Sequence, residues 1–391
     1  MKYLLTHIII FLISYYFCYL NIPYFIIFII SLLKESIKYY FYKKKTKKCK
    51  NKKQETFFNI LVCAKNEEDR IVRCLESLTN INYPSELYHI TIINDHSTDN
   101  TVSNSINFLK NKKWKNYRII NRERKNGFVA GVLNDGIISY DLSKKSFFGI
   151  IDADCLVSTE ILNRVNSEII SNRLDALGVK EWHLTSNNPI NSSQHLLCVY
   201  ENYNNTSNFK VGHFFSNSVA KRIKYDEKSI LEDKLFSEEC MINNYKIKII
   251  DDVLLFRNFS SNLKKIYSQQ YRYQLGSIYN DSKNSKITNT MLISLLLLFT
   301  IIIDYKQFLK IIIYIIIEVY SGIFIYYHNY YMMALLNSPI ELKNLIKSQY
   351  RDNSLINLLS TFIFLFFVIF LRLVPFYRTI LGIEKIKWNR F

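Results

Sequence analysis

Two carboxylates separated by one residue follow an apolar segment near the middle of the chain. Residues 147–151 (FFGII) lead directly into Asp152-Ala153-Asp154. Because side chains at positions i and i+2 of an extended chain project to the same side, both carboxylates are expected to face one point. Two negative charges at the end of an apolar strand are costly unless a cation or hydrogen-bond donors compensate. A hard, oxygen-ligated ion such as Mg²⁺ or Mn²⁺, bridged to a diphosphate, fits this need.

Three further polar clusters could take part in the same chemistry, and each has a structural alternative. Asp95 follows the apolar residues 89–93, a position where a carboxylate can accept hydrogen bonds from a ribose or a base edge. The residues just after it, 97–99, could instead cap the next helix. The acidic residues 232–233 precede an apolar helical pattern and could simply favour the helix dipole. Residues 269–276 (QQYRYQLG) combine amides, an arginine and aromatic rings, or form an interfacial aromatic belt.

The elements that position these clusters follow from the hydrophobic pattern of residues 56–280. Short apolar, β-branched runs alternate there with helical patterns, which predicts an α/β fold with a mostly parallel sheet covered by helices. Ligands of such sheets bind beyond the carboxyl ends of the strands. The predicted strands are residues 57–63, 89–93, 117–120, 147–151 and 177–180. A polar, mostly acidic cluster follows each of the first four.

Apolar segments flank this region on both sides. Residues 3–33 are almost wholly apolar, and the run is too long for a secretory signal peptide, so an N-terminal membrane anchor is expected. Eight lysines within residues 43–53 place the following domain in the cytoplasm by the positive-inside rule. Residues 288–303, 308–327 and 354–376 predict three further crossings. The chain is therefore expected to be a multi-pass integral membrane protein with a cytoplasmic catalytic domain.

These patterns predict four regions along the 391 residues. They are a transmembrane anchor (1–42), a basic cytoplasmic linker (43–55), a catalytic domain (56–280) and a C-terminal transmembrane region (281–391).

Composition excludes several other classes of protein. The net charge is +18, but its densest basic cluster lies beside a membrane segment and is not interleaved with aromatic residues, so no nucleic-acid partner is expected. Seven scattered cysteines contain no C-x-x-C pair, and neither a disulfide framework nor a zinc site is predicted. The sequence predicts neither protein partners nor an oligomeric state.

The order of these motifs resembles that of family 2 glycosyltransferases, in particular the membrane branch that contains cellulose, chitin, hyaluronan and poly-N-acetylglucosamine synthases. The resemblance covers roughly residues 56–280, with hydrophobic flanks as in that branch. It implies a GT-A, Rossmann-like nucleotide-diphospho-sugar transferase domain. Residues 127–134 (GFVAGVLN) look like the family's G-Y-K-A-G-A-L-N stretch, with Val129 in place of a lysine that commonly lies near the nucleotide.

That resemblance implies a role for eight residues. Asp95 contacts the nucleotide, while Asp152 and Asp154 bind the diphosphate and a Mg²⁺ or Mn²⁺ ion. Asp233 is the general base that deprotonates the acceptor hydroxyl. The remaining four residues lie near the acceptor and the diphosphate: Glu232, Gln269, Arg272 and Tyr273. Two positions depart from the family's Q-x-x-R-W pattern, since Tyr273 replaces the usual tryptophan and Gln270 a common arginine.

The implied reaction is an inverting single displacement from a nucleotide-diphospho-sugar, with UDP-sugars the donors that the resembling enzymes mostly use. The acceptor expected from the glutamine-arginine motif is a growing polysaccharide. Single-sugar transfer to a lipid, such as a polyprenyl phosphate or a ceramide, is the alternative. A non-catalytic membrane scaffold that retained the fold is a third hypothesis, supported by Val129 and Tyr273.

Overall fold

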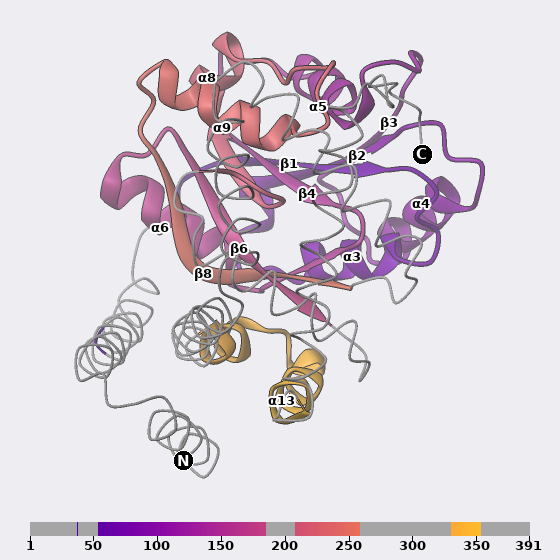
Figure 1. Cartoon of the computed structure of the whole chain (residues 1–391). Coiled ribbons are helices and arrows are strands. Elements are labelled where there is room, and N and C mark those ends of the chain that lie inside the picture. The colour runs from indigo at the N-terminus through magenta and orange to yellow at the C-terminus, as the bar shows by residue number, and fades with distance from the viewer. Residues whose placement is uncertain (1–36, 38–53, 185–207, 259–329, 353–391) are drawn as a thin grey trace, which may run out of the picture. The chain divides into compact units, whose positions relative to one another are not determined.

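A computed structural model describes residue 37 and residues 54–184, 208–258 and 330–352 (Figure 1). Within these residues the chain forms an α/β domain on a mixed, eight-stranded sheet of order β3-β2-β1-β4-β7-β6-β8-β5. The pairs β1·β2, β1·β4, β2·β3 and β6·β8 are parallel, and β4·β7, β5·β8 and β6·β7 are antiparallel. The strand bounds are β1 Phe58–Ala64, β2 Tyr88–Asn94, β3 Tyr117–Asn121, β4 Phe147–Asp152, β5 Cys155–Val157, β6 Ala176–Leu184, β7 His213–Ser216 and β8 Ile247–Asn258.

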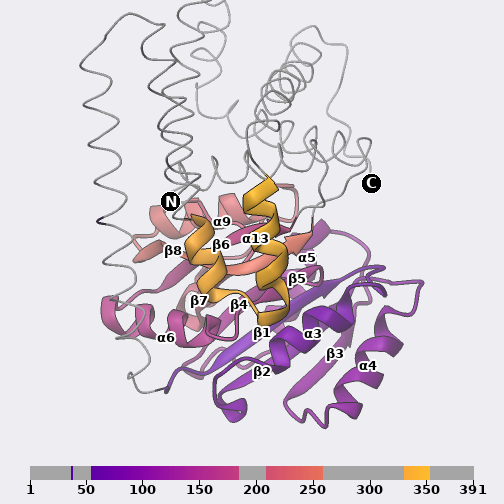
Figure 2. The same ribbon diagram turned by 90° about the horizontal axis from the view of Figure 1, so that it is seen from below.

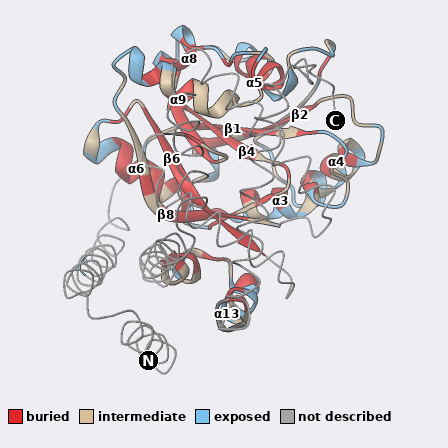
Figure 3. Ribbon diagram, in the orientation of Figure 1, coloured by how far each residue is buried: buried red, intermediate tan, exposed pale blue. Residues whose placement is uncertain are grey.

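Helices cover both faces of this sheet, and each face has its own hydrophobic core. One core contains apolar side chains of α3 (Ile71–Thr79), α4 (Thr101–Asn111) and α6 (Ile161–Asn172). The other contains those of α5 (Phe128–Ile138), α8 (Asn217–Arg222) and α9 (Glu232–Ile242). Figure 3 shows the central strands buried between these layers, with the exposed residues on the outer sides of the helices.

The two cores explain why the central strands are continuous apolar runs. In β1, Phe58, Ile60 and Val62 belong to the first core while Leu61 belongs to the second. A strand with one face in water would need polar residues at every second position, whereas a strand covered on both faces does not. This pattern makes β1, β2 and β4 recognisable from the sequence.

All five predicted strands exist: β1 has the predicted length but begins one residue later, and the other four are longer than predicted by between one and five residues. The prediction missed β5, β7 and β8, which are the strands that make the antiparallel pairs. β5 has only three residues, and β8 carries two aspartates, Asp251 and Asp252, in its middle. The aspartates interrupt the apolar pattern of β8, and β5 is too short to be identified as a covered strand.

Long-range ion pairs stabilise the aspartates of β8. Arg164 of α6 contacts Asp252 with both side chains buried, and Lys180 of β6 lies 2.7 Å from Asp251. The β6·β8 register is irregular at this point, between Gly178 and Lys180 and again at Glu181. Successive side chains of a strand point to opposite faces, so the two aspartates meet partners on different elements.

The unit that contains the sheet comprises Lys48–Ile278 and Met333–Phe391. Its later part includes a 3₁₀ turn, η2 (Ile340–Leu342), and the helix α13 (Lys343–Asp352), which is seen from below in Figure 2. The indole nitrogen of Trp182 in β6 donates a hydrogen bond to Oε1 of Gln349 in α13 at 3.1 Å. A segment 167 residues further along the chain therefore contacts the sheet.

The predicted membrane segments (3–33, 288–303, 308–327 and 354–376) lie outside the described residues. Among the helices that the structure describes, none combines the length and the apolar character needed to cross a bilayer.

Candidate active site

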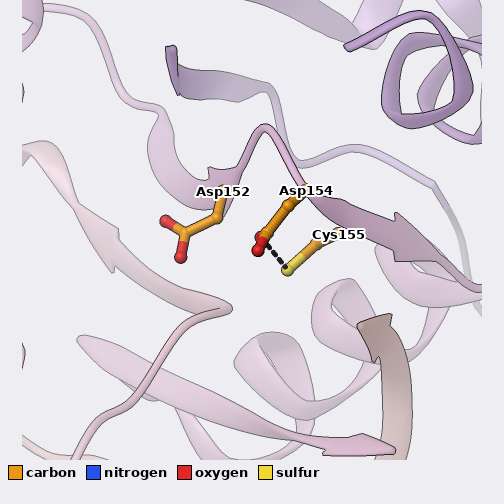
Figure 4. Close-up of side chains that lie close together, drawn as sticks. All are labelled: Asp152, Asp154 and Cys155. Atoms are coloured by element: carbon orange, nitrogen blue, oxygen red, sulfur yellow. Dashed lines mark hydrogen bonds between the residues drawn. The ribbon is translucent and has the colours of Figure 1, made fainter. Parts of the chain in front are cut away.

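Asp152 and Asp154 come together at the carboxyl end of β4. Asp152 is the last residue of the strand, Ala153 and Asp154 form a turn, and Cys155 begins β5. One carboxylate oxygen of each aspartate and Sγ of Cys155 all lie within 4.8 Å of one another (Figure 4). The convergence was predicted correctly, but its cause was not, since a turn and not an extended strand places Asp154 beside Asp152.

Arg257, near the end of β8, compensates the charge of both aspartates. Its Nη2 lies 3.0 Å from Oδ2 of Asp152, and its Nε lies 3.3 Å from Oδ2 of Asp154. Burial would lower the pKa of Arg257, but the nearby carboxylates of Asp154, Asp152 and Glu181 keep it above its usual range. Arg257 was not singled out in the sequence because β8 itself was missed. The signal that could have found it is a lone arginine closing the apolar run 253–256.

Asp95 lies directly after β2, held by its backbone and its side chain. Its N–H donates to the carbonyl of Ala64 at the end of β1. Its carboxylate accepts a 2.9 Å hydrogen bond from Nη1 of Arg122, and Nζ of Lys65 lies 3.4 Å away. Asp95 is not an N-cap of α4; Asp99 instead accepts the N–H of Thr101 at the start of that helix.

Arg122 and Arg124 extend this network to the glycine-containing stretch before α5. Both arginines pair with Asp135, and Nη2 of Arg124 also lies 2.7 Å from Oε1 of Glu227. Gly127 precedes α5 with a φ of +87°, and a Cβ there would lie 2.5 Å from Oε2 of Glu227. The turn therefore needs a residue without a side chain.

Val129, in the first turn of α5, is 42% exposed. The position where the resembling family has a lysine is thus open to solvent.

Glu232 and Asp233 form the first turn of α9, as predicted. The N–H of Lys234 donates to Oδ1 of Asp233 at 2.7 Å. Burial, reinforced by the charge of Asp152, raises the pKa of Asp233 to about 6, although that hydrogen bond and the charge of Lys210 oppose the shift. A carboxyl group with a raised pKa is suited to proton transfer near neutral pH.

The thiol of Cys63 marks the point where these acidic groups converge. Burial raises the pKa of Cys63, and the charges of Asp152, Glu232 and Asp95 raise it further. Cys63 lies near the end of β1 and is in register with Asp152 of β4, so the charges of acidic groups from β4, from α9 and from beyond β2 all reach the carboxyl end of one central strand. Parallel strands meet at such an edge, where open α/β sheets bind ligands.

The structure therefore brings five of the eight predicted site residues to one region: Asp95, Asp152, Asp154, Glu232 and Asp233. The other three, Gln269, Arg272 and Tyr273, lie outside the described residues.

The side chains at the end of β4 fit a hard divalent cation. Asp152 and Asp154 offer carboxylate oxygens, the ligand type that Mg²⁺ and Mn²⁺ prefer. Sγ of Cys155, the third member of the group, is a soft ligand that these two hard ions do not favour. The paired guanidinium contacts also show that the two carboxylates attract positive charge.

Comparison with protein families decides what kind of domain carries this site. The model of glycosyl transferase family group 2 matches residues 147–374, more than half of the chain. The chain belongs to this family. The model of glycosyl transferase family 2 also matches, at residues 59–226, which include Asp95, Asp152 and Asp154. The site thus belongs to a glycosyltransferase domain.

Curated relatives of this glycosyltransferase include enzymes named for lipid and for polysaccharide products. The chain is 32% identical over 110 residues to a β-monoglucosyldiacylglycerol synthase of Nostoc sp., which covers 28% of this chain and 22% of that protein. It is 23% identical over 229 residues to a probable glucomannan 4-β-mannosyltransferase 3 of Oryza sativa subsp. japonica, covering 54% and 41%. Each match thus spans less than half of the relative's length.

Among solved structures, the glycosyltransferase aligns with a mannosyltransferase from Pyrobaculum calidifontis that was solved with GDP-Man and Mn²⁺. The TM-score is 0.45 at 13% identity, with 85% of this chain and 97% of that chain covered.

Proposed function

We propose that the chain is an inverting glycosyltransferase that moves a sugar from a nucleotide-diphospho-sugar to a hydroxyl acceptor. The observation that carries this proposal is Asp233, whose burial and proximity to the charge of Asp152 raise its pKa to about 6. A base with that pKa is mostly ionised at neutral pH and still takes up a proton readily.

In this reaction the acceptor oxygen forms a bond to the anomeric carbon while the bond from that carbon to the diphosphate breaks. Asp233 takes the hydroxyl proton, and Asp95, fixed by Arg122, binds the nucleotide. Asp152 and Asp154 would hold Mg²⁺ or Mn²⁺, an ion that neutralises charge on a departing diphosphate when bound. Arg272 is proposed to support the same charge, and Glu232, Gln269 and Tyr273 to line the acceptor side. An α-linked donor gives a β-linked product.

The acceptor that we propose is a growing polysaccharide, with a UDP-sugar as donor. The glutamine-arginine motif at residues 269–273 supports it, as does the relative named for glucomannan. A lipid acceptor is the alternative, favoured by the relative named for a glucosyl diacylglycerol product. A GT-A domain on the cytoplasmic side of a multi-pass membrane protein completes the proposal, supported by the family membership, the apolar flanks and the lysines of residues 43–53.

The test uses membranes that contain the full chain, incubated with labelled UDP-glucose, UDP-N-acetylglucosamine or GDP-mannose and Mn²⁺. Label in long chains supports the polysaccharide acceptor, and label in the solvent-extractable fraction supports the lipid alternative. Label in neither fraction for any donor contradicts the transferase proposal and favours the scaffold.

Two variants of the same preparation check the assigned roles. Asp233→Asn removes the base and keeps the size of the side chain, so transfer should fall by about 10²-fold or more. Equal activity of this variant and wild type would remove Asp233 from the mechanism. Undiminished transfer in excess chelator would remove the metal role of Asp152 and Asp154.

A further inference from the structure

The positively charged guanidinium of Arg257 contacts the same two carboxylates that would bind a divalent ion. The Nε and Nη2 edge of its guanidinium faces the two aspartates, with Nη2 3.0 Å from Oδ2 of Asp152 and Nε 3.3 Å from Oδ2 of Asp154. Oxygens of the same two carboxylates are close enough together to share one ion. A guanidinium and a divalent ion therefore compete for the negative charge of this pair.

The opposite corner of the same guanidinium faces a third carboxylate. Nη1 of Arg257 lies 3.8 Å from Oε2 of Glu181, whose side chain is only 7% exposed. Glu181 lies two residues before His183 on β6, and His183 is in register with Arg257 on the neighbouring β8. Burial alone would raise the pKa of Glu181, but the charges of His183 and Arg257 hold it at about 2. The carboxylate is thus ionised and placed to receive the guanidinium.

We propose that Arg257 is a resident counter-ion that passes from Asp152 and Asp154 to Glu181 when a divalent ion binds. The residue is a positioning residue: it keeps the two aspartates together and lowers their affinity for a free metal ion. A metal ion that arrives with a diphosphate brings further ligands and so displaces Arg257 more easily than the ion alone. This inference rests on the metal role within the proposed function.

The test measures Mn²⁺ binding to the purified full chain by electron paramagnetic resonance of the free ion, without any sugar nucleotide. Arg257→Gln should bind Mn²⁺ more tightly than wild type, on the order of tenfold, the change that one charge-assisted hydrogen bond carries. Glu181→Gln should bind it more weakly, because Arg257 then has no second ionised carboxylate to move to. Arg257→Lys should fall between wild type and Arg257→Gln, since an ammonium keeps the charge but cannot bridge both aspartates.

Two controls locate the effect at this site. Asp154→Asn should lose the binding, which shows that the measured Mn²⁺ is held at the end of β4. Arg118→Gln changes an arginine of β3 that contacts Thr91 and Ser139, and it should leave the affinity unchanged. Thermal melts in chelator and in Mn²⁺ report folding, and Mn²⁺ should raise the melting temperature of Arg257→Gln more than that of wild type.

The expected changes in Mn²⁺ affinity have opposite signs for the Arg257 and Glu181 variants, so the experiment can contradict the proposal. If Arg257→Gln does not fold, Arg257→Lys and Glu181→Gln still have to shift the affinity in opposite directions. Arg257 variants that bind Mn²⁺ no more tightly than wild type, or Glu181→Gln that binds it more tightly, overturn the proposal. Because no donor or acceptor is present, a failed transfer assay with this order of affinities intact would count against the proposed reaction alone.

Discussion

Arg164 of α6 and Asp252 of β8 form a buried, bidentate ion pair. The distances from Nε to Oδ1 and from Nη2 to Oδ2 are both 2.8 Å. Only 5% and 4% of the two side chains are exposed. The pair connects a helix of the first core to β8, the strand that also carries Arg257 five residues further along.

Removing one partner of this pair should destabilise the domain strongly. Arg164→Met leaves the Asp252 carboxylate buried without its cation, and we expect the free energy of unfolding to fall by about 3–5 kcal/mol. Equilibrium denaturation of the purified chain in urea measures the change. The double variant Arg164→Met with Asp252→Leu removes both charges and should be clearly more stable than the single variant. Equal loss in the two would show that packing and not charge explains the effect.

Gly127→Ala should destabilise the turn before α5. The new Cβ would lie 2.5 Å from Oε2 of Glu227, and the φ of +87° is unfavourable for alanine. We expect a loss of about 1–3 kcal/mol, the cost of one residue in a strained conformation, measured by the same denaturation experiment. Val129→Ala is the matched control, because Val129 is in the same turn but 42% exposed. A loss of the same size in the control would contradict the role given to the glycine.

The contrast between β4 and β8 explains how far the sequence could predict this structure. β4 is covered on both faces, so its apolar run alone identifies the strand and places Asp152 at its carboxyl end. β8 depends on Asp252 meeting Arg164, 88 residues earlier, and no local pattern shows such a partner.

The site residues show the same contrast between local patterns, which a sequence reveals, and distant pairings, which it does not. Asp95, Asp152 and Asp233 could be found because each lies just beyond, at the end of or at the start of a locally encoded element. Arg257 reaches the site only through the pairing of β8 with β5 and β6. The turn at Asp154 could not be predicted either, because two aspartates separated by one residue have the same spacing in the sequence whether they lie in a strand or in a turn.

Val129→Lys tests whether the stretch 127–134 has the same role as in the family it resembles. Val129 is exposed in the first turn of α5, so a lysine fits there without repacking. A cation near the donor diphosphate should lower the KM for the sugar nucleotide by about three- to tenfold, the effect of roughly 1 kcal/mol, with kcat little changed. Val129→Gln has similar length and no charge, and it should behave like wild type. The same KM for all three proteins would place this position away from the donor.

The transfer rate should depend on the ionisation of Asp233. The base acts only when deprotonated, and its pKa is raised to about 6. We therefore expect kcat/KM to rise with pH up to a plateau above this value, in assays of wild-type membranes across buffers of constant ionic strength. Asp233→Glu keeps a carboxyl group and should retain a pH-dependent rate with a shifted midpoint. The range from about pH 5 to 7 extends roughly one pH unit on either side of such a pKa. A kcat/KM that stays constant across this range would argue against Asp233 as the base.

Asp233 should also destabilise the folded domain as pH rises, which gives a readout independent of activity. The unfolded chain ionises this group near its ordinary pKa of 3.8, whereas the folded domain retains the proton up to about 6. Between these values the folded state binds more protons, so the free energy of unfolding falls with rising pH and then stays constant. Asp233→Asn cannot ionise and should lose this contribution. Its melting temperature should match that of wild type below pH 3.8 and exceed it above pH 6. This comparison needs neither donor nor acceptor. If Asp233→Asn is less stable than wild type above pH 6, the folded domain stabilises the ionised carboxylate of Asp233. That result would contradict a base whose pKa is raised by burial and by the charge of Asp152.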